Sequence, residues 1–151
     1  MEAENVIVGL LADFVVATPE DALQYAPLVQ NGKPVPPDRF QRARYKNFTP
    51  LAVEMLWAIL RHEQWDVRHH RLEHVSHTEG GESWLERFPD ELVHRLSALN
   101  EADQNLVADA WARAKEVPGN TDELRPVLRD LRHLAAQAET SGRSLYLWGS
   151  L

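Results

Sequence analysis

The sequence predicts an α+β fold in which a small, mostly antiparallel sheet is covered by four to five helices. Two observations carry this prediction. Segments rich in β-branched and apolar residues stand near both chain ends, and a third extended region in the middle is interrupted by Gly80-Gly81. Most of the remaining chain has helical periodicity. Of the 151 residues, 44% are hydrophobic, so residues 1–151 can bury one core and are predicted to form a single domain.

The first expected elements are a strand and a short helix. Residues 6–17 are rich in β-branched and apolar residues, which predicts a buried N-terminal strand. Thr18 suits a helix N-cap, and Pro19 suits the first helical position. Pro27 is expected to end this helix early. A proline-rich loop follows over residues 30–38.

A basic, aromatic stretch covers residues 39–48. We expect one or two helical turns here, with Phe40, Tyr45 and Phe48 packed inward and the arginines in solvent. Arginines beside aromatic rings also suit RNA, but no fingerprint of a nucleic-acid module accompanies them. A protein-binding patch is the better functional alternative, because Arg and aromatic residues are enriched at interfaces.

The middle of the chain holds a helix and a segment of ambiguous structure. Thr49-Pro50 opens an apolar helix that should run to about residues 62–64 and be central and buried. Residues 67–77 contain Val, Ser and several His, which are mediocre helix formers. The turn signal Gly80-Gly81 and the alternating residues 84–88 indicate a β-hairpin. A hairpin over residues 67–87 is therefore favoured over a helix.

The C-terminal half predicts three helices and a last strand. The helices begin at Pro89-Asp90, at Asn100 and at about Asp122, and the third is expected to end at Ser141 with Gly142 as its cap. Residues 144–148 form the C-terminal strand. It is expected to pair with the N-terminal strand, since chain ends often lie close together.

The arrangement resembles the YfbM-like family of uncharacterised bacterial proteins. The resemblance rests on the strand and helix start at residues 14–21, on Leu56-Trp57-Ala58-Ile59-Leu60, and on the helix, glycine and strand of residues 131–148. These segments cover about half of the chain and contain no chemical motif. The histidine-containing hairpin is unlike the family. The resemblance implies an α+β fold and no known activity.

Residues 70–74 read H-x-x-E-H, a spacing that one class of zinc hydrolases uses on a helix. On a helix, His70 and His74 would bind one zinc ion, with His77 as a third ligand and Glu73 as the base. On a strand, His70 and His74 would stand about 13 Å apart, too far to share one metal ion. A small zinc-dependent hydrolase is therefore the alternative hypothesis, and the favoured one involves no cofactor.

Because the sequence has no G-x-S-x-G, P-loop or G-x-G-x-x-G motif, it favours a binding protein over an enzyme. The net charge of −7 argues against DNA or RNA as the partner. No apolar run is long enough for a membrane span, the first residues are acidic, and there is no cysteine. We expect a cytoplasmic, bacterial-type protein that binds another protein, as immunity-type inhibitors and regulatory proteins do. The candidate interaction surface comprises Arg39, Arg42, Arg44, Tyr45 and Trp84.

Overall fold

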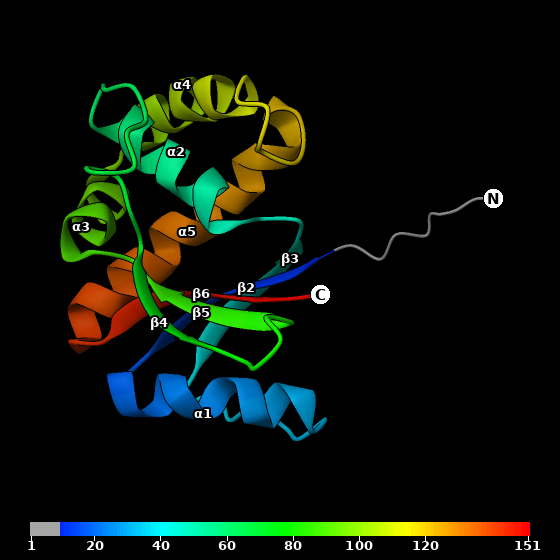
Figure 1. The fold of residues 1–151 in the computed structure, drawn as a ribbon. Coiled ribbons are helices and arrows are strands. Elements are labelled where there is room, and N and C mark those ends of the chain that lie inside the picture. The colour runs from blue at the N-terminus through cyan, green and yellow to red at the C-terminus, as the bar shows by residue number, and fades with distance from the viewer. Residues whose placement is uncertain (1–9) are drawn as a thin grey trace.

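The computed structural model describes residues 10–151, which form three layers (Figure 1). One sheet lies in the middle, α1 covers one of its faces, and the other helices lie on the opposite side with α5 against the sheet. The strands of the described residues are β2 (Leu11–Ala17), β3 (Gln41–Lys46), β4 (Glu73–His77), β5 (Ser83–Arg87) and β6 (Ser144–Ser150). The helices are α1 (Pro19–Gln30), α2 (Pro50–Leu60), α3 (Asp90–Ala98), α4 (Glu101–Ala112) and α5 (Thr121–Ser141).

The sheet confirms the predicted α+β class. Its strand order is β3-β2-β6-β5-β4, and each neighbouring pair is antiparallel. The predicted pairing of the N-terminal and C-terminal strands is present, because β2 and β6 lie side by side with Val15 opposite Tyr146. The part of the expected first strand before residue 10 lies outside the described residues. Within residues 10–151, no helix is both long and apolar enough to cross a membrane.

Each face of the sheet has its own core. The larger core lies under α5 and includes Phe14 and Leu147, which point to the same face because they are cross-strand neighbours. The smaller core lies under α1, where Tyr25 packs edge-on against Trp148. Strand β2 is thus buried on both faces, which explains its nearly continuous apolar sequence.

Capping residues set the helix starts, and two of them, Thr18 and Asn100, are those that the sequence predicts. The side chains of Thr18, Asn100 and Asn120 each accept a hydrogen bond from a backbone N–H in the first turn. Gly142 ends α5 with φ of 68°, a left-handed conformation that suits glycine. The expected end of the first helix at Pro27 is wrong, because α1 continues to Gln30. Pro27 lacks an N–H for the carbonyl of Leu23, but Leu23 lies on the exposed side of the helix, where water can bond that carbonyl.

The basic, aromatic stretch is a strand, which corrects the expected helical turns. Residues 41–46 alternate strictly between half-buried and exposed positions. Such a period of two is the mark of a strand with one wet face, and the pairing with β2 fixes it. Phe40 and Phe48, just outside the strand, are buried as expected.

The favoured hairpin at the middle of the chain is also present. Strands β4 and β5 pair across a turn that contains Gly80 and Gly81, both with positive φ. The first strand of the hairpin, β4, is shorter than expected, since residues 67–70 form a turn and only Glu73–His77 are extended. Among the described strands, β3 and β4 are the two edges of the sheet. Strand β3 carries the basic, aromatic stretch, and β4 carries Glu73, His74 and His77.

Candidate functional site

A buried carboxylate organises the basic side chains of β3. Asp13 on β2 has no exposed surface and stands directly opposite Arg44 on β3. The Arg44 guanidinium donates from Nε to Oδ1 at 2.7 Å and from Nη2 to Oδ2 at 2.9 Å. The hydroxyl of Tyr25, on α1, donates to the same carboxylate. Burial and the hydrogen bond to Asp13 raise the pKa of Tyr25 well above its usual value, so the hydroxyl stays protonated and continues to donate.

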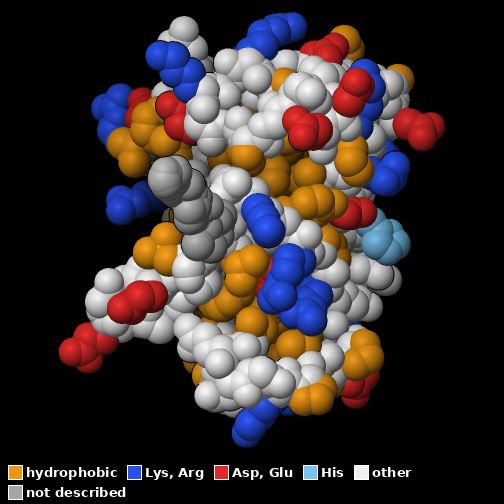
Figure 2. Space-filling model, turned by 90° about the vertical axis from the view of Figure 1, so that its right-hand side faces the viewer, with side chains coloured by type: hydrophobic (Ala, Val, Ile, Leu, Met, Phe, Trp, Pro, Cys, Tyr) orange, Lys and Arg blue, Asp and Glu red, His pale blue; other side chains and the backbone are white. Residues whose placement is uncertain are grey.

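A second guanidinium adds positive charge to this cluster. Arg42 donates from Nη1 to the hydroxyl oxygen of Tyr25 at 2.9 Å and lies 3.8 Å from Oδ2 of Asp13. Two arginines thus share one carboxylate, which leaves a net positive charge. Their side chains are 37% and 44% exposed. Figure 2, which views the side of the molecule where both chain ends lie in Figure 1, shows Lys and Arg side chains gathered in the middle of that face, among hydrophobic side chains.

The other members of the predicted interaction surface have different surroundings. Arg39 pairs with Asp21 at 2.8 Å, and this hydrogen bond lowers the pKa of Asp21. Tyr45 points to the opposite face of the sheet, where its hydroxyl bonds Asp130 of α5. Trp84 lies on β5, with β2 and β6 between it and β3, and packs against Gly149. The five residues therefore do not form one surface; Arg42 and Arg44 are brought together, and Trp84 is separate.

Three hollows lie along α5, and two of them also border the edge strand β3. They share lining residues: Gln41 and Gln137 line two of them, and His133 lines all three. The two beside β3 have volumes of about 310 and 400 Å³. We call these three hollows together the β3–α5 groove. Its basic members are Arg42, Arg129, Arg132, His133 and Arg143.

The charge of the groove is opposite to that of the protein. No Asp or Glu occurs among the described residues that line it, although the chain has 23 acidic against 16 basic residues. Gln41 contributes a polar atom of a different kind. Its Oε1 is buried and has no hydrogen-bond partner within residues 10–151. A buried acceptor without a donor is costly, so this oxygen favours a ligand that brings an N–H.

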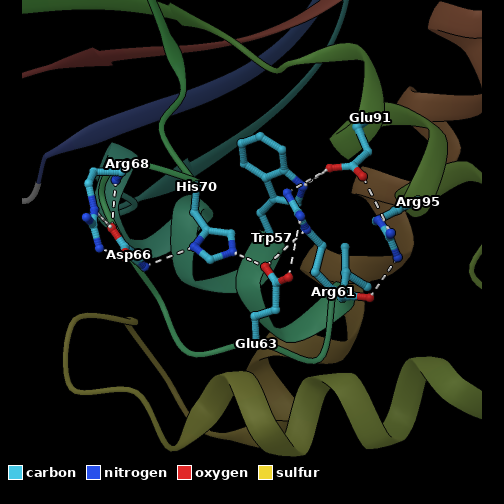
Figure 3. Close-up of polar contacts among 9 residues, drawn as sticks. Trp57, Arg61, Glu63, Asp66, Arg68, His70, Glu91 and Arg95 are labelled. Carbon is cyan, nitrogen blue, oxygen red and sulfur yellow. Dashed lines mark hydrogen bonds and ion pairs between the residues drawn. The ribbon is translucent and has the colours of Figure 1, made fainter.

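The buried histidine of the H-x-x-E-H string has a structural role. His70 is 1% exposed and lies in the turn before β4 (Figure 3). Its Nδ1 accepts a hydrogen bond from the backbone N–H of Asp66 at 2.9 Å, so the ring proton resides on Nε2, which donates to Glu63 at 2.8 Å. Arg61 in turn binds Glu63 at 3.1 Å. Because both ring nitrogens are engaged, His70 has no lone pair to offer a metal ion.

The rest of the string lies on the hairpin and does not join His70. Glu73 pairs with Arg87 on β5 at 3.1 Å. His74 contacts Glu86 and His77. The trio His70, Glu73 and His74 of the zinc-hydrolase alternative is thus divided among three separate sets of partners. Within the described residues, no group of three or more histidine or carboxylate side chains is arranged to hold a metal ion.

Sequence reasoning overlooked both the buried Asp13 and the residues of α5 that line the groove. Asp13 carried a signal, because a charged residue inside a buried apolar strand requires a partner of opposite charge. The alternation of residues 41–46 also indicated a strand. His133, Gln137 and Arg143 gave no such signal, since their meeting with β3 depends on how α5 crosses the sheet.

No protein-family model, curated protein or solved structure matches this chain, so the resemblance to the YfbM-like family stays a prediction.

Proposed function

We propose that the protein binds an extended, acidic segment of a partner protein in the β3–α5 groove. The observation that carries this proposal is the coincidence of a sheet edge that no other strand of residues 10–151 covers with a groove lined by basic and not by acidic described residues. An edge strand offers unpaired backbone N–H and C=O groups, to which an extended segment can add as a further strand. The groove beside it would receive the side chains of that segment.

Charge selects the partner. The exposed residues of β3 are Arg42, Arg44 and Lys46, so the β3 edge of a second copy would meet like charge and be repelled. An acidic segment would be attracted instead, and the attraction would speed its encounter with the groove. A nucleic acid would extend past the groove, and the net charge of −7 means that its phosphates would meet the acidic remainder of the surface, whereas a short acidic segment would contact the groove alone. A protein segment is therefore favoured over RNA or DNA.

Two features would fix the position of the segment. The unpaired Oε1 of Gln41 would accept an N–H from it. Val35, Phe40 and Leu134 line the hollow nearest the start of β3 and would receive an apolar side chain. The expected ligand thus alternates acidic and apolar residues, as a strand with one charged and one apolar face does.

A labelled peptide of about ten residues that alternates Glu and Val tests the proposal by fluorescence anisotropy. We expect binding that weakens as salt is added, and at least tenfold weaker binding to the variant Arg129→Glu/Arg143→Glu. The variant Arg113→Glu/Lys115→Glu, at the end of α4, carries the same change in net charge away from the groove and should bind as the wild type does. Equal losses in both variants would contradict the proposal, as would equal affinity for a peptide with Lys in place of Glu.

A further inference from the structure

A β-bulge brings two histidines of the edge strand β4 to one face of the sheet. In a regular strand, residues three apart point to opposite faces. In the hairpin, Glu86 stands opposite His74 and Leu85 opposite Ser76, so Val75 is an extra residue. The bulge therefore turns His74 and His77 to the same side. Their ring centroids are 5.1 Å apart, and Nε2 of His74 lies 2.9 Å from Nδ1 of His77.

Glu86 determines which ring nitrogen of His74 carries the proton. Its carboxylate contacts Nδ1 of His74, which places the ring proton on that nitrogen. Nε2 of His74 is then an unprotonated nitrogen aimed at His77. The Glu86 side chain is only 12% exposed, whereas that of His74 is 51% exposed. A largely buried carboxylate that orients an accessible imidazole is the arrangement that supports histidine ligands of metal ions.

We propose that His74 and His77 chelate a divalent transition-metal ion of the Ni²⁺, Cu²⁺ and Zn²⁺ group, through Nε2 of His74 and Nδ1 of His77. Imidazole nitrogens suit these ions. With metal–nitrogen distances of about 2.0–2.1 Å, two ligand nitrogens lie about 2.9 Å apart at a right angle and about 3.3 Å apart at a tetrahedral angle. The separation of 2.9 Å in the protein is thus compatible with a square-planar ion and needs only a small opening for a tetrahedral one.

Metal binding requires a single proton shift and no redox change. In the hydrogen-bonded pair, Nδ1 of His77 donates its proton to Nε2 of His74. When the ion binds, that proton moves to Nε2 of His77 by way of solvent, and both rings remain neutral and donate a lone pair each. Water completes the coordination. With two protein ligands the site is weaker than a structural zinc site of four. It lies at the edge of the sheet opposite β3, so it does not depend on the function proposed for the groove.

Titration of the untagged protein with Ni²⁺ and Cu²⁺, followed by calorimetry, tests the site. We expect one preferred site per chain, and the variant His74→Ala/His77→Ala should bind at least tenfold more weakly. Glu86→Gln should weaken binding about tenfold, because it removes the support of His74 without removing a ligand. Electron paramagnetic resonance of the Cu²⁺ form should show nitrogen ligands that the double variant lacks.

The matched control is His69→Ala/His94→Ala, which removes two other exposed histidines and should bind as tightly as the wild type. Thermal melting of the metal-free proteins checks that each variant is folded. The proposal is overturned if folded His74→Ala/His77→Ala keeps wild-type affinity or the nitrogen signal. It is equally overturned if the control loses as much affinity as that variant.

Discussion

Asp13 and Arg44 face each other across the pair of strands β2 and β3, and the guanidinium of Arg44 donates to both oxygens of the carboxylate. The two ends of this pair are in different environments: Asp13 is fully buried, and the Arg44 side chain is 44% exposed. The pair therefore joins the core to the surface. It holds the arginines of the edge strand in fixed positions, and it makes the strand's polar face depend on one buried charge.

The difference in exposure predicts unequal costs for removing either partner. Arg44→Ala leaves a buried carboxylate without its bidentate donor and should lower the free energy of unfolding by about 3 kcal/mol or more. Asp13→Ala leaves an arginine that can turn to water, so the loss should be smaller, although a cavity forms in the sheet. Urea denaturation of both variants measures the order. A larger loss for Asp13→Ala would contradict this account.

The parts of the fold that sequence predicts are those specified by local chemistry. The short run of β-branched and apolar residues around Phe14 indicates a buried strand, and Thr18 and Asn100 can cap helices without reference to the rest of the chain. The hairpin followed from Gly80-Gly81 and from poor helix formers. Each of these features is decided within about ten residues, which is the range over which capping, turn chemistry and periodicity act.

The features that the sequence did not predict depend on tertiary contacts. The sequence predicted Arg42 and Arg44 on the solvated side of a helix. In the structure they lie on a strand that pairs with β2, where both interact with Asp13. His70 and His74 looked like one motif, but the turn before β4 buries the first and exposes the second. The groove joins residues of β3 with residues of α5 that are about 90 positions later, and no local pattern records such a meeting.

Trp84 lies flat against the backbone of Gly149, its cross-strand neighbour. A Cβ added at Gly149 would stand 2.6 Å from the indole ring. Gly149→Ala should therefore lower the free energy of unfolding by about 1–3 kcal/mol through overpacking. In a Trp84→Ala background the same change should cost little, so a double-mutant cycle should reveal a large coupling. An additive result would show that the indole is not what limits this position.

The carboxylates on either side of His70 make the segment sensitive to acid. The hydrogen bond with His70 lowers the pKa of Glu63, and the side chain and backbone N–H of Arg68 lower that of Asp66. A carboxyl with a lowered pKa in the folded state stabilises the protein above its unfolded pKa of about 4, and this contribution is lost as the pH falls below that value.

Glu63→Gln and Asp66→Asn should thus be less stable than the wild type near pH 6, and the difference should shrink toward about pH 3. Urea midpoints at several pH values give the measurement. Glu116→Gln, at an exposed position after α4, is the control and should follow the wild type throughout. A gap that stays constant with pH would mean that ionisation of these carboxyls is not the source of the stability.

A substitution at Tyr45 should change the stability of the protein without changing peptide binding at the edge strand β3. Its hydroxyl donates to Asp130 of α5, and burial and this hydrogen bond raise the pKa of Tyr45. The contact ties β3 to the helix that forms the other wall of the groove, so Tyr45 is a strand-to-helix link and not part of a ligand surface. Tyr45→Phe keeps the ring and its packing against Phe14 and Phe48 but removes the hydrogen bond. We expect a loss of about 1.5 kcal/mol in the free energy of unfolding, because the acceptor is charged.

The same variant should bind the acidic peptide as the wild type does at temperatures where both are folded. Arg42→Gln should show the converse, with weaker peptide binding and a smaller effect on stability, since Asp13 keeps both of its bonds to Arg44. The two variants change residues of the same strand that point to opposite faces, which makes them controls for each other. If Tyr45→Phe weakened binding as much as Arg42→Gln, the tyrosine would belong to the interaction surface, and its assignment as a purely structural link between β3 and α5 would be wrong.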